Sequence, residues 1–204
     1  MKPNDDLQVW HTVKPEDLWV FDKLILSRKL GYSCGPKGIY VPYPGKYIVR
    51  PCVNLLGMGR GAKVMTLKGN TEHNLADGTF WCEIFKGRHL SIDYLDGKQI
   101  LCVEGIKKSA SNMQRWKMWK KVTDKPRLPK IIRELRDRYK YLNVEMIDGK
   151  IIEVHFRLNP DFADHDSPYV IPVYEDEQIS PNSRQEFIID AEGERIGFYI
   201  RKQR

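Results

Sequence analysis

The sequence lacks any long apolar run. Nowhere in its 204 residues does it approach the about 18 consecutive apolar residues that a membrane-spanning helix needs. Behind its first basic residue, Lys2, there is no apolar stretch of the kind found in secretory signals. It also lacks a C-x-x-C pair, and its four cysteines are scattered, which indicates small buried hydrophobic residues rather than zinc or redox chemistry. These absences predict a cytoplasmic protein with no membrane partner.

Acidic residues are in the minority. The chain has 34 Lys and Arg against 27 Asp and Glu, a formal net charge of +7. Such a surplus attracts polyanions, whether nucleic acid, nucleotide phosphates or acidic peptides, but it is mild for a dedicated DNA-binding protein. The length suits one large domain or two small lobes that share a core. Hydrophobic residues make up 41% of the chain, which is ordinary for a globular protein.

The hydrophobic pattern predicts an α+β fold dominated by antiparallel hairpins. Two helices are expected, over residues 14–31 and 129–140, and each has a proline near its start. Asp-Gly pairs at 96–97 and 148–149 are typical of tight hairpin turns. The expected strands are 47–49, 62–67, 79–85, 89–95, 99–106, 142–147, 151–156, 170–174, 186–189 and 196–200.

A glycine-rich loop lies between two predicted strands. Gly57, Gly59 and Gly61 alternate along it, and glycines allow backbone N–H groups to converge on phosphate oxygens. The loop is neither a Walker A motif, since no Lys-Ser/Thr follows, nor a dinucleotide fingerprint, since a strand follows rather than a helix. A flexible hairpin is the alternative interpretation. Three cations suited to a triphosphate flank it or lie in it: Arg50, Arg60 and Lys63.

The second group of polar residues lies in the predicted hairpin around residues 148–149. Alternate side chains of a strand share a face, so Glu153, His155 and Arg157 are expected to point one way and Ile152, Val154 and Phe156 toward the core. The turn brings Glu145 onto the partner strand, and its facing depends on a register that the sequence leaves open. Two carboxylates and a histidine on one face suit Mg²⁺. An exposed polar face of a half-buried sheet is the alternative.

The order of these segments resembles the ATP-grasp superfamily from about residue 22 to residue 160. The resemblance rests on a strand that ends in Arg50-Pro51, the glycine loop, a strand, and then Cys-Glu-Ile-Phe-Lys-Gly-Arg-His-Leu-Ser-Ile-Asp-Tyr-Leu and Glu-Val-His-Phe-Arg. It implies two lobes of mainly antiparallel sheet with flanking helices and a nucleotide cleft between them. The implied division is a small lobe (1–84), a large lobe (85–174) and a C-terminal extension (175–204). By this resemblance, the chain is expected to lack the upstream domain of many family enzymes.

The resemblance also implies ATP and Mg²⁺ as cofactors and assigns roles to particular residues. The implied nucleotide-binding residues are Arg50, Gly57, Gly59, Arg60, Gly61, Lys63, Glu83, Ile84, Phe85 and His89. The implied metal ligands are Glu145, Glu153 and His155. His155 stands where the family pattern Glu-x-Asn has its Asn, and Arg50 stands where the family has a Lys. Arg157 and Lys63 would offset the charge that develops during phosphoryl transfer.

The implied activity is that of an ADP-forming carboxylate–amine ligase acting on a small-molecule or peptide carboxylate. An acylphosphate forms first, and an amine then attacks it. The alternative is a non-catalytic nucleic-acid-binding protein that uses the basic, irregular segment 107–130, in which Trp116 and Trp119 alternate with Lys and Arg. Packing of both tryptophans into the core is the simpler interpretation of that segment. A homodimer contact through the C-terminal extension is left open.

Overall fold

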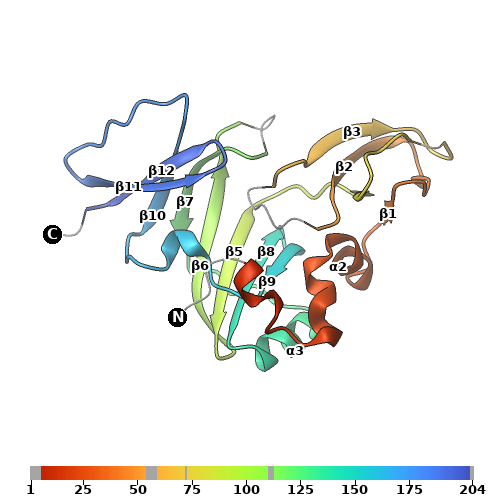
Figure 1. The fold of residues 1–204 in the computed structure, drawn as a ribbon, viewed down its shortest axis with the longest axis horizontal. Coiled ribbons are helices and arrows are strands. Elements are labelled where there is room, and N and C mark those ends of the chain that lie inside the picture. The colour runs from red at the N-terminus through yellow and green to blue at the C-terminus, as the bar shows by residue number, and fades with distance from the viewer. Residues whose placement is uncertain (1–5, 54–58, 72, 110–112, 203–204) are drawn as a thin grey trace.

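A computed structural model describes residues 6–53, 59–71, 73–109 and 113–202. Their strands form two antiparallel sheets, which confirms the α+β prediction (Figure 1). The smaller sheet has the strand order β1-β4-β2-β3. Its strands are β1 (Cys34–Pro36), β2 (Gly45–Pro51), β3 (Lys63–Leu67) and β4 (Thr79–Cys82). The predicted strand over 79–85 therefore ends three residues early, at Cys82.

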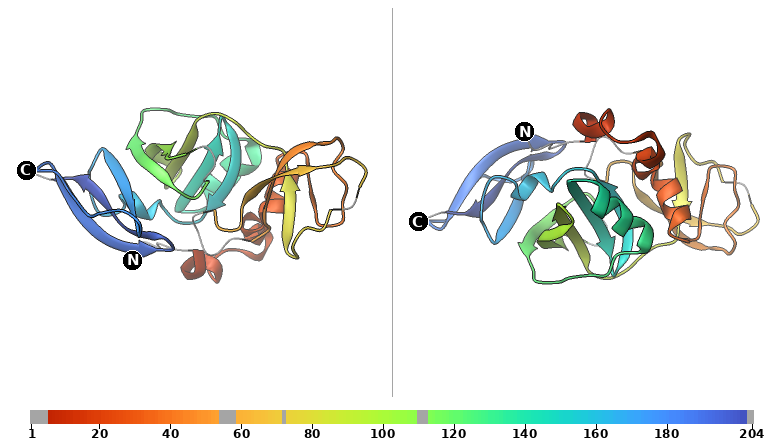
Figure 2. Two further views of the ribbon diagram at one scale, coloured as in Figure 1. Left: turned by 90° about the horizontal axis from the view of Figure 1, so that it is seen from above. Right: turned by 90° about the horizontal axis from the view of Figure 1, so that it is seen from below.

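The larger sheet has eight strands in the order β11-β12-β10-β7-β6-β5-β8-β9. They are β5 (His89–Leu95), β6 (Lys98–Lys107), β7 (Trp116–Lys121), β8 (Tyr141–Ile147), β9 (Lys150–His155), β10 (Tyr169–Tyr174), β11 (Gln185–Glu192) and β12 (Arg195–Arg201). Both predicted Asp-Gly turns are present, and all four residues have the positive φ that a type I′ turn requires. The C-terminal residues thus extend this sheet, and they lie at the opposite end of the molecule from the small sheet (Figure 2).

The helices are short. They are α1 (Asp6–Trp10), the 3₁₀ helix η1 (Pro15–Phe21), α2 (Lys23–Lys29), α3 (Lys130–Arg138) and the 3₁₀ helix η2 (Pro160–Phe162). The single helix expected over 14–31 is wrong because Asp22 divides it. Asp22 has extended backbone angles, and its carboxylate accepts hydrogen bonds from the N–H groups of Leu24 and Ile25. Asp22 is therefore the N-cap of α2.

The prediction that the segment 107–130 is irregular is wrong in part, because the segment contains strand β7. Trp116 and Trp119 are each 8% exposed and join a core cluster with Val103, Val170 and Phe198. The interpretation that both tryptophans pack in the core is confirmed, and the base-stacking argument for nucleic-acid binding is lost with it. No helix of the described residues is long and apolar enough to cross a membrane.

The large sheet buries one face of strands β5, β8 and β9 against helices. Ile92, Val144 and Val154 lie on this face and pack with Ile132 and Leu135 of α3. Successive side chains of the small sheet point to opposite faces, and each face packs against its own core cluster. Val49 of β2 lies in one cluster, and its neighbour Ile48 packs against the other. The opposite face of β5, β8 and β9 carries the polar residues described next.

Candidate functional site

A polar face lies on β5, β8 and β9. Two rows of directly paired residues cross these strands: Ser91, Glu145 and Glu153 in one row, and Asp93, Asn143 and His155 in the other. We call this set, with His89 and Arg157, the polar face. The register that the sequence left open therefore places Glu145 directly opposite Glu153, so both carboxylates leave the same side of the sheet.

A β-bulge sets the facing of these residues. The pairing of β8 with β9 shifts between Glu145 and Met146, so Ile152 is an extra residue. As a result Ile151, 1% exposed, joins the core, whereas strict alternation predicted Ile152 there. Beyond the bulge the alternation holds, with Val154 in the core and Glu153 on the polar face. The side predicted for Glu153, His155 and Arg157 is correct even though that for Ile152 is not.

Each glutamate of the pair already contacts a cation or a proton donor. Glu145 Oε2 lies 3.1 Å from His89 Nε2, and Glu153 Oε1 lies 2.5 Å from Lys23 Nζ. Burial raises the pKa of Glu145, but the hydrogen bond from His89 together with the charges of His89 and His155 outweighs it, and the pKa is lowered. Burial likewise opposes ionisation of Glu153, yet the charges of Lys23 and His155 hold its pKa well below the ordinary value. Two ionised carboxylates therefore stand side by side.

His155 is a cation in this arrangement. Its Nδ1 lies 2.7 Å from Asp6 Oδ2 and its Nε2 lies 3.4 Å from Glu153 Oε2. Burial and the charge of Arg157 lower the pKa of His155, but Asp6 and Glu153 outweigh them and raise it to about 9. An imidazolium with a carboxylate at each nitrogen has no lone pair for a metal. Among the described residues, no group of three or more His, Cys, Asp or Glu side chains is arranged to hold a metal ion.

Asp6 is the site residue that no sequence pattern indicated. It lies in α1, 149 positions before His155, and is only 8% exposed. Its Oδ1 also lies 3.5 Å from Arg157 Nε, so one carboxylate joins both cations of the polar face. The only local feature that marks Asp6 is its position as an acidic residue at the start of a helix. Such a residue is usually explained by its interaction with the helix dipole and does not by itself indicate a site.

Asp93 fixes the chain that follows β9. It is 3% exposed and accepts hydrogen bonds from Asn143 Nδ2, at 2.8 Å, and from the N–H of Asn159, at 3.0 Å. Burial raises the pKa of Asp93 to about 6, against the effect of those two hydrogen bonds. Arg157 lies two residues before Asn159, so this network holds the segment that carries its guanidinium.

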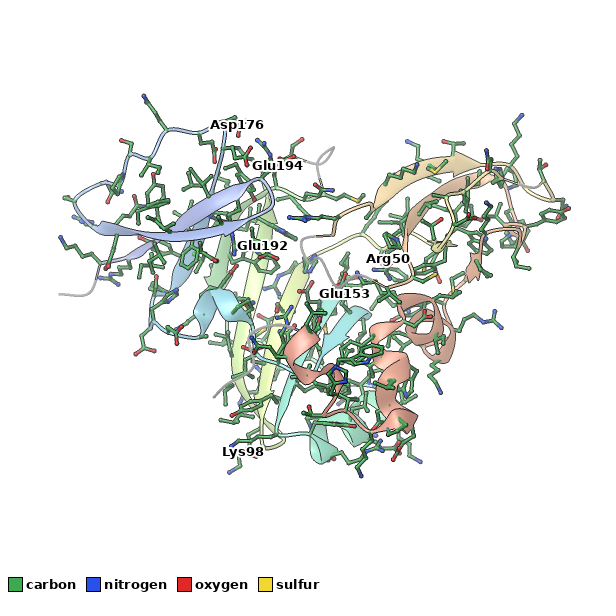
Figure 3. All side chains as sticks on the ribbon, viewed as in Figure 1. Arg50, Lys98, Glu153, Asp176, Glu192 and Glu194 are labelled. Carbon is green, nitrogen blue, oxygen red and sulfur yellow. The ribbon has the colours of Figure 1, made fainter. Side chains whose placement is uncertain are left out.

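Arg50 lies on β2 and is directed from the small sheet toward the polar face. It is 7% exposed, and its guanidinium lies 5.2 Å from the centre of the Phe80 ring. Its Nε has no hydrogen-bond partner, and none of the described carboxylates forms an ion pair with it. It is near enough to Glu153 to lower the pKa of that carboxyl, and both side chains lie where the two sheets meet (Figure 3). A buried guanidinium without a counter-ion is costly.

Comparisons with solved structures agree on the fold. A protein from Archaeoglobus fulgidus, assigned to the ATP-grasp superfamily by its description, aligns over 91% of this chain and 65% of its own, with a TM-score of 0.51 and 18% identity. N5-carboxyaminoimidazole ribonucleotide synthetase from Thermus thermophilus aligns over 97% and 73%, with a TM-score of 0.54 and 10% identity. The chain has the ATP-grasp fold. The resemblance seen in the sequence is confirmed at this level.

Sequence comparison alone does not reach these proteins. No family model matches the chain, and no curated protein matches it either. The chain spans 65% of the length of the Archaeoglobus protein. Identities of 10% and 18% are low enough that the ATP-grasp fold is what the two structures share with this chain.

The structure brings few of the implied phosphate-binding residues to Arg50. Lys63 of β3 pairs with Val49, the neighbour of Arg50, so it is exposed on the opposite face of the small sheet. Arg60 lies against Gly193 in the turn between β11 and β12. Gly59 and Gly61 both have positive φ, as a glycine loop requires. Gly57 lies outside the described residues.

The segment 83–85, which the resemblance implies to bind the nucleotide, is partly buried. Glu83 Oε1 accepts a hydrogen bond from the N–H of Ser33 at 2.9 Å, which ties the segment to the residue before β1. Ile84 follows it, and the Phe85 ring lies 4.7 Å from that of Tyr32. His89, another implied nucleotide-binding residue, contacts Glu145. A space of about 10 Å³ beside Lys23, Glu153 and His155 is too small for a nucleotide.

Proposed function

We propose that this protein is an ATP-dependent, ADP-forming ligase that activates a carboxylate as an acylphosphate for attack by an amine. The ATP-grasp fold supports ligase chemistry at the level of the superfamily. The observation that carries the proposal is the pair of ionised carboxylates, Glu145 and Glu153, beside a buried guanidinium, Arg50, that forms no ion pair with any residue the structure describes. A nucleotide phosphate would pair with that guanidinium, and a divalent cation would relieve the repulsion between the carboxylates.

Mg²⁺ fits two of the three implied ligands. Glu145 and Glu153 are ionised, directly opposed and supply oxygen, the ligand atom that Mg²⁺ prefers. His155 does not fit, because both its nitrogens face carboxylates and it carries a positive charge. When bound, the ion would neutralise phosphate charge and polarise the phosphoryl group. Its remaining positions would belong to phosphate oxygens and water.

The chain's own residues supply binding and charge. In the first step a carboxylate oxygen attacks the γ-phosphorus of ATP, the bond to the β–γ bridging oxygen breaks, and ADP leaves with that oxygen. Arg50 would hold the phosphates, while His155 and Arg157, fixed by Asp6, would offset the charge spread over the transferred group. The amine then attacks the acyl carbon, phosphate leaves, and the proton from nitrogen leaves with it.

Lys23 has a specific part in this proposal. Its ammonium is bound to Glu153 and only 7% of its side chain is exposed. Because Lys23 occupies Oε1 of Glu153, a divalent cation would be held by Glu145 and by the second oxygen of Glu153, which His155 also contacts. Lys23 would keep Glu153 in place for that role.

Thermal unfolding with ATP, with Mg²⁺ and with both is the test. A ligand that binds only the folded state adds RT ln(1 + [L]/Kd), about 2.7 kcal/mol at a hundredfold excess over Kd. We expect stabilisation that needs both ATP and Mg²⁺ and that is lost in Glu153→Gln. The matched control is Glu186→Gln, on exposed β11, which should respond as the wild type does. The same Mg-ATP stabilisation in Glu153→Gln would remove the carboxylate pair from the nucleotide site.

A further inference from the structure

Lys107 is a second cation, partly buried, that has no counter-ion among the described residues. It is the last residue of β6, two positions after Gly105, which pairs with His89 of the polar face. Its side chain therefore leaves the sheet on the same side as the polar face. Its Nζ donates to the carbonyl of Met113 and lies 3.3 Å from the centre of the Trp116 ring. No carboxylate of the described residues pairs with it.

The neighbouring cations behave in the opposite way. Lys108 pairs with Glu177, and Arg115 pairs with Asp176 and Glu194. Lys108 is exposed, whereas Lys107 is partly buried. Surface ion pairs contribute little to stability, but a desolvated ammonium without a carboxylate is costly. Lys108 and Arg115 are thus paired with carboxylates, whereas the partly buried Lys107 has no carboxylate partner among the described residues.

Burial has a measurable consequence at this ammonium. Desolvation lowers the pKa of Lys107 to about 8, although the nearby charge of Glu145 acts in the other direction. An anion placed against the ammonium would reverse that shift. The group has N–H donors beyond the one given to Met113, so it can receive such an anion without losing its existing hydrogen bond.

The surroundings of Lys107 form one side of the polar face. His89 lies with its ring centre 4.8 Å from that of Trp116, at an angle of 89°, and the Trp116 and Trp119 centres lie 4.3 Å apart. The same His89 contacts Glu145. The carboxylate pair therefore has cations on both sides: the charges of Lys23 and Arg50 lower the pKa of Glu153, and Lys107 interacts electrostatically with Glu145.

We propose that Lys107 binds a carboxylate of the acceptor substrate, against the wall formed by Trp116 and His89 and next to Glu145. The inference rests on the ligase function proposed above. Arg50 serves the nucleotide phosphates on the Glu153 side, so the anion at Lys107 is a second one. A carboxylate is flat and small enough to accept from the free N–H groups while the ammonium stays over the Trp116 ring.

The test observes Lys107 directly. Lysine amines of the full chain are ¹³C-methylated, and the Lys107 signal is identified by its absence in Lys107→Arg. Succinate serves as the carboxylate probe and Mg-ATP as the phosphate probe. We expect saturating succinate to raise the pKa of Lys107 from about 8 by at least one unit and Mg-ATP to leave it unchanged. A pKa shift with Mg-ATP alone would assign Lys107 to the nucleotide. If neither probe changes the pKa, Lys107 is not an anion site. Either outcome overturns the proposal.

Two variants separate this proposal from the ligase function. Lys107→Met keeps the length of the side chain over Trp116; it should bind succinate at least tenfold more weakly in a calorimetric titration while keeping the stabilisation by Mg-ATP. Lys108→Met, the exposed neighbour, should keep both. If Mg-ATP fails to stabilise the wild type but succinate still moves Lys107, the nucleotide function fails and the anion site stands. Equal succinate binding by Lys107→Met and wild type would reject the site.

Discussion

The buried cations of this protein are of two kinds: those that pair with carboxylates and those that do not. Arg195 is 3% exposed, but its guanidinium pairs with Asp161, Asp190 and Glu192. These three carboxylates balance the charge of the guanidinium and tie β12 to η2 and β11, although its Nε, like that of Arg50, has no hydrogen-bond partner among the described residues. Arg50 and Lys107 have no such carboxylates among the described residues. At the residue scale, a buried cation that the fold leaves unpaired is the strongest sign of a site for an anion.

Replacing Arg50 tests that distinction. In Arg50→Met the guanidinium is replaced by an apolar side chain of similar length, so the burial penalty disappears while the contact with Phe80 is largely kept. We expect a melting temperature equal to or above that of the wild type, together with at least tenfold weaker Mg-ATP binding, or about 1.4 kcal/mol. Lys46→Met, at an exposed position of the same strand, is the control. Loss of stability with intact Mg-ATP binding would make Arg50 a structural residue.

His155 makes a pH-dependent contribution to stability. Its pKa is raised to about 9 from an ordinary value of 6.5, so the folded state binds the proton more tightly than the unfolded state. The contribution is complete below pH 6.5 and is lost as the pH rises through 9, a change on the order of 3 kcal/mol. The free energy of unfolding of the wild type minus that of His155→Gln, measured in urea, should fall over this interval.

The matched control for that measurement is His11→Gln, because His11 is exposed. Its stability should follow that of the wild type at every pH. A constant difference between wild type and His155→Gln from pH 6 to pH 10 would mean that His155 is not held as an imidazolium between Asp6 and Glu153. The interpretation of its two contacts as ion pairs would then be wrong.

At the scale of elements, the close packing of β6 against two indoles depends on Gly105. A Cβ at this position would lie 2.5 Å from Trp116 Cζ3 and 2.8 Å from Trp119. Side chains cannot approach that closely, so Gly105→Ala must displace both rings from their positions over the strand. We expect a loss of about 1 to 3 kcal/mol in the free energy of unfolding, measured by urea denaturation, with a shift in tryptophan fluorescence.

Gly45→Ala is the control for that substitution. Gly45 begins β2, has no positive φ, and the nearest atom to its added Cβ lies 3.9 Å away. Its stability should change by less than about 0.5 kcal/mol. Equal effects of the two substitutions would show that strand glycine itself, and not the contact with the tryptophans, sets the cost at Gly105.

The sequence predicts the strands and turns of this fold better than it predicts which side chains of a strand point toward the core. The Asp-Gly turns fix two hairpins because turn chemistry is local, and Glu145 therefore had to lie on the strand next to Glu153. The bulge at Ile152 and the cap at Asp22 are also single-residue features, but each competes with a periodicity that continues straight through it. Alternation alone therefore assigns Ile152 to the core, and helical spacing alone joins η1 to α2.

The site depends on contacts between residues far apart in the sequence, which no local sequence pattern predicts. His155 fits the ATP-grasp pattern for a metal ligand until Asp6, 149 positions away, is placed against it. Lys63 and Arg50 are both cations near the glycine loop, yet opposite faces of the small sheet separate them. Composition and spacing identified the carboxylate pair because both residues lie in one hairpin. The charges that surround the pair come from α1, α2 and β2, which only the assembled molecule brings together.

The C-terminal residues are part of the large sheet through both strand pairing and core packing. β12 pairs with β10 along five residues, and Phe198 and Ile200 are 6% and 4% exposed within the cluster that contains Trp119. A chain that ends at Tyr174 would lose both side chains, each worth roughly 2 kcal/mol of burial, and would expose β10 as an edge. Asp161 would lose its partner Arg195.

Because small domains are stable by only about 5 to 15 kcal/mol, we expect the chain ending at Tyr174 to unfold without a cooperative transition. The measurement is calorimetry beside a chain ending at Arg201, which keeps β12 whole and should melt as the full chain does. A cooperative transition in the shorter chain, with Mg-ATP still stabilising it, would make residues 175–204 a dispensable cap. Loss of both the transition and the Mg-ATP response would instead mean that the polar face, the Lys107 site and the C-terminal strands form one folding unit.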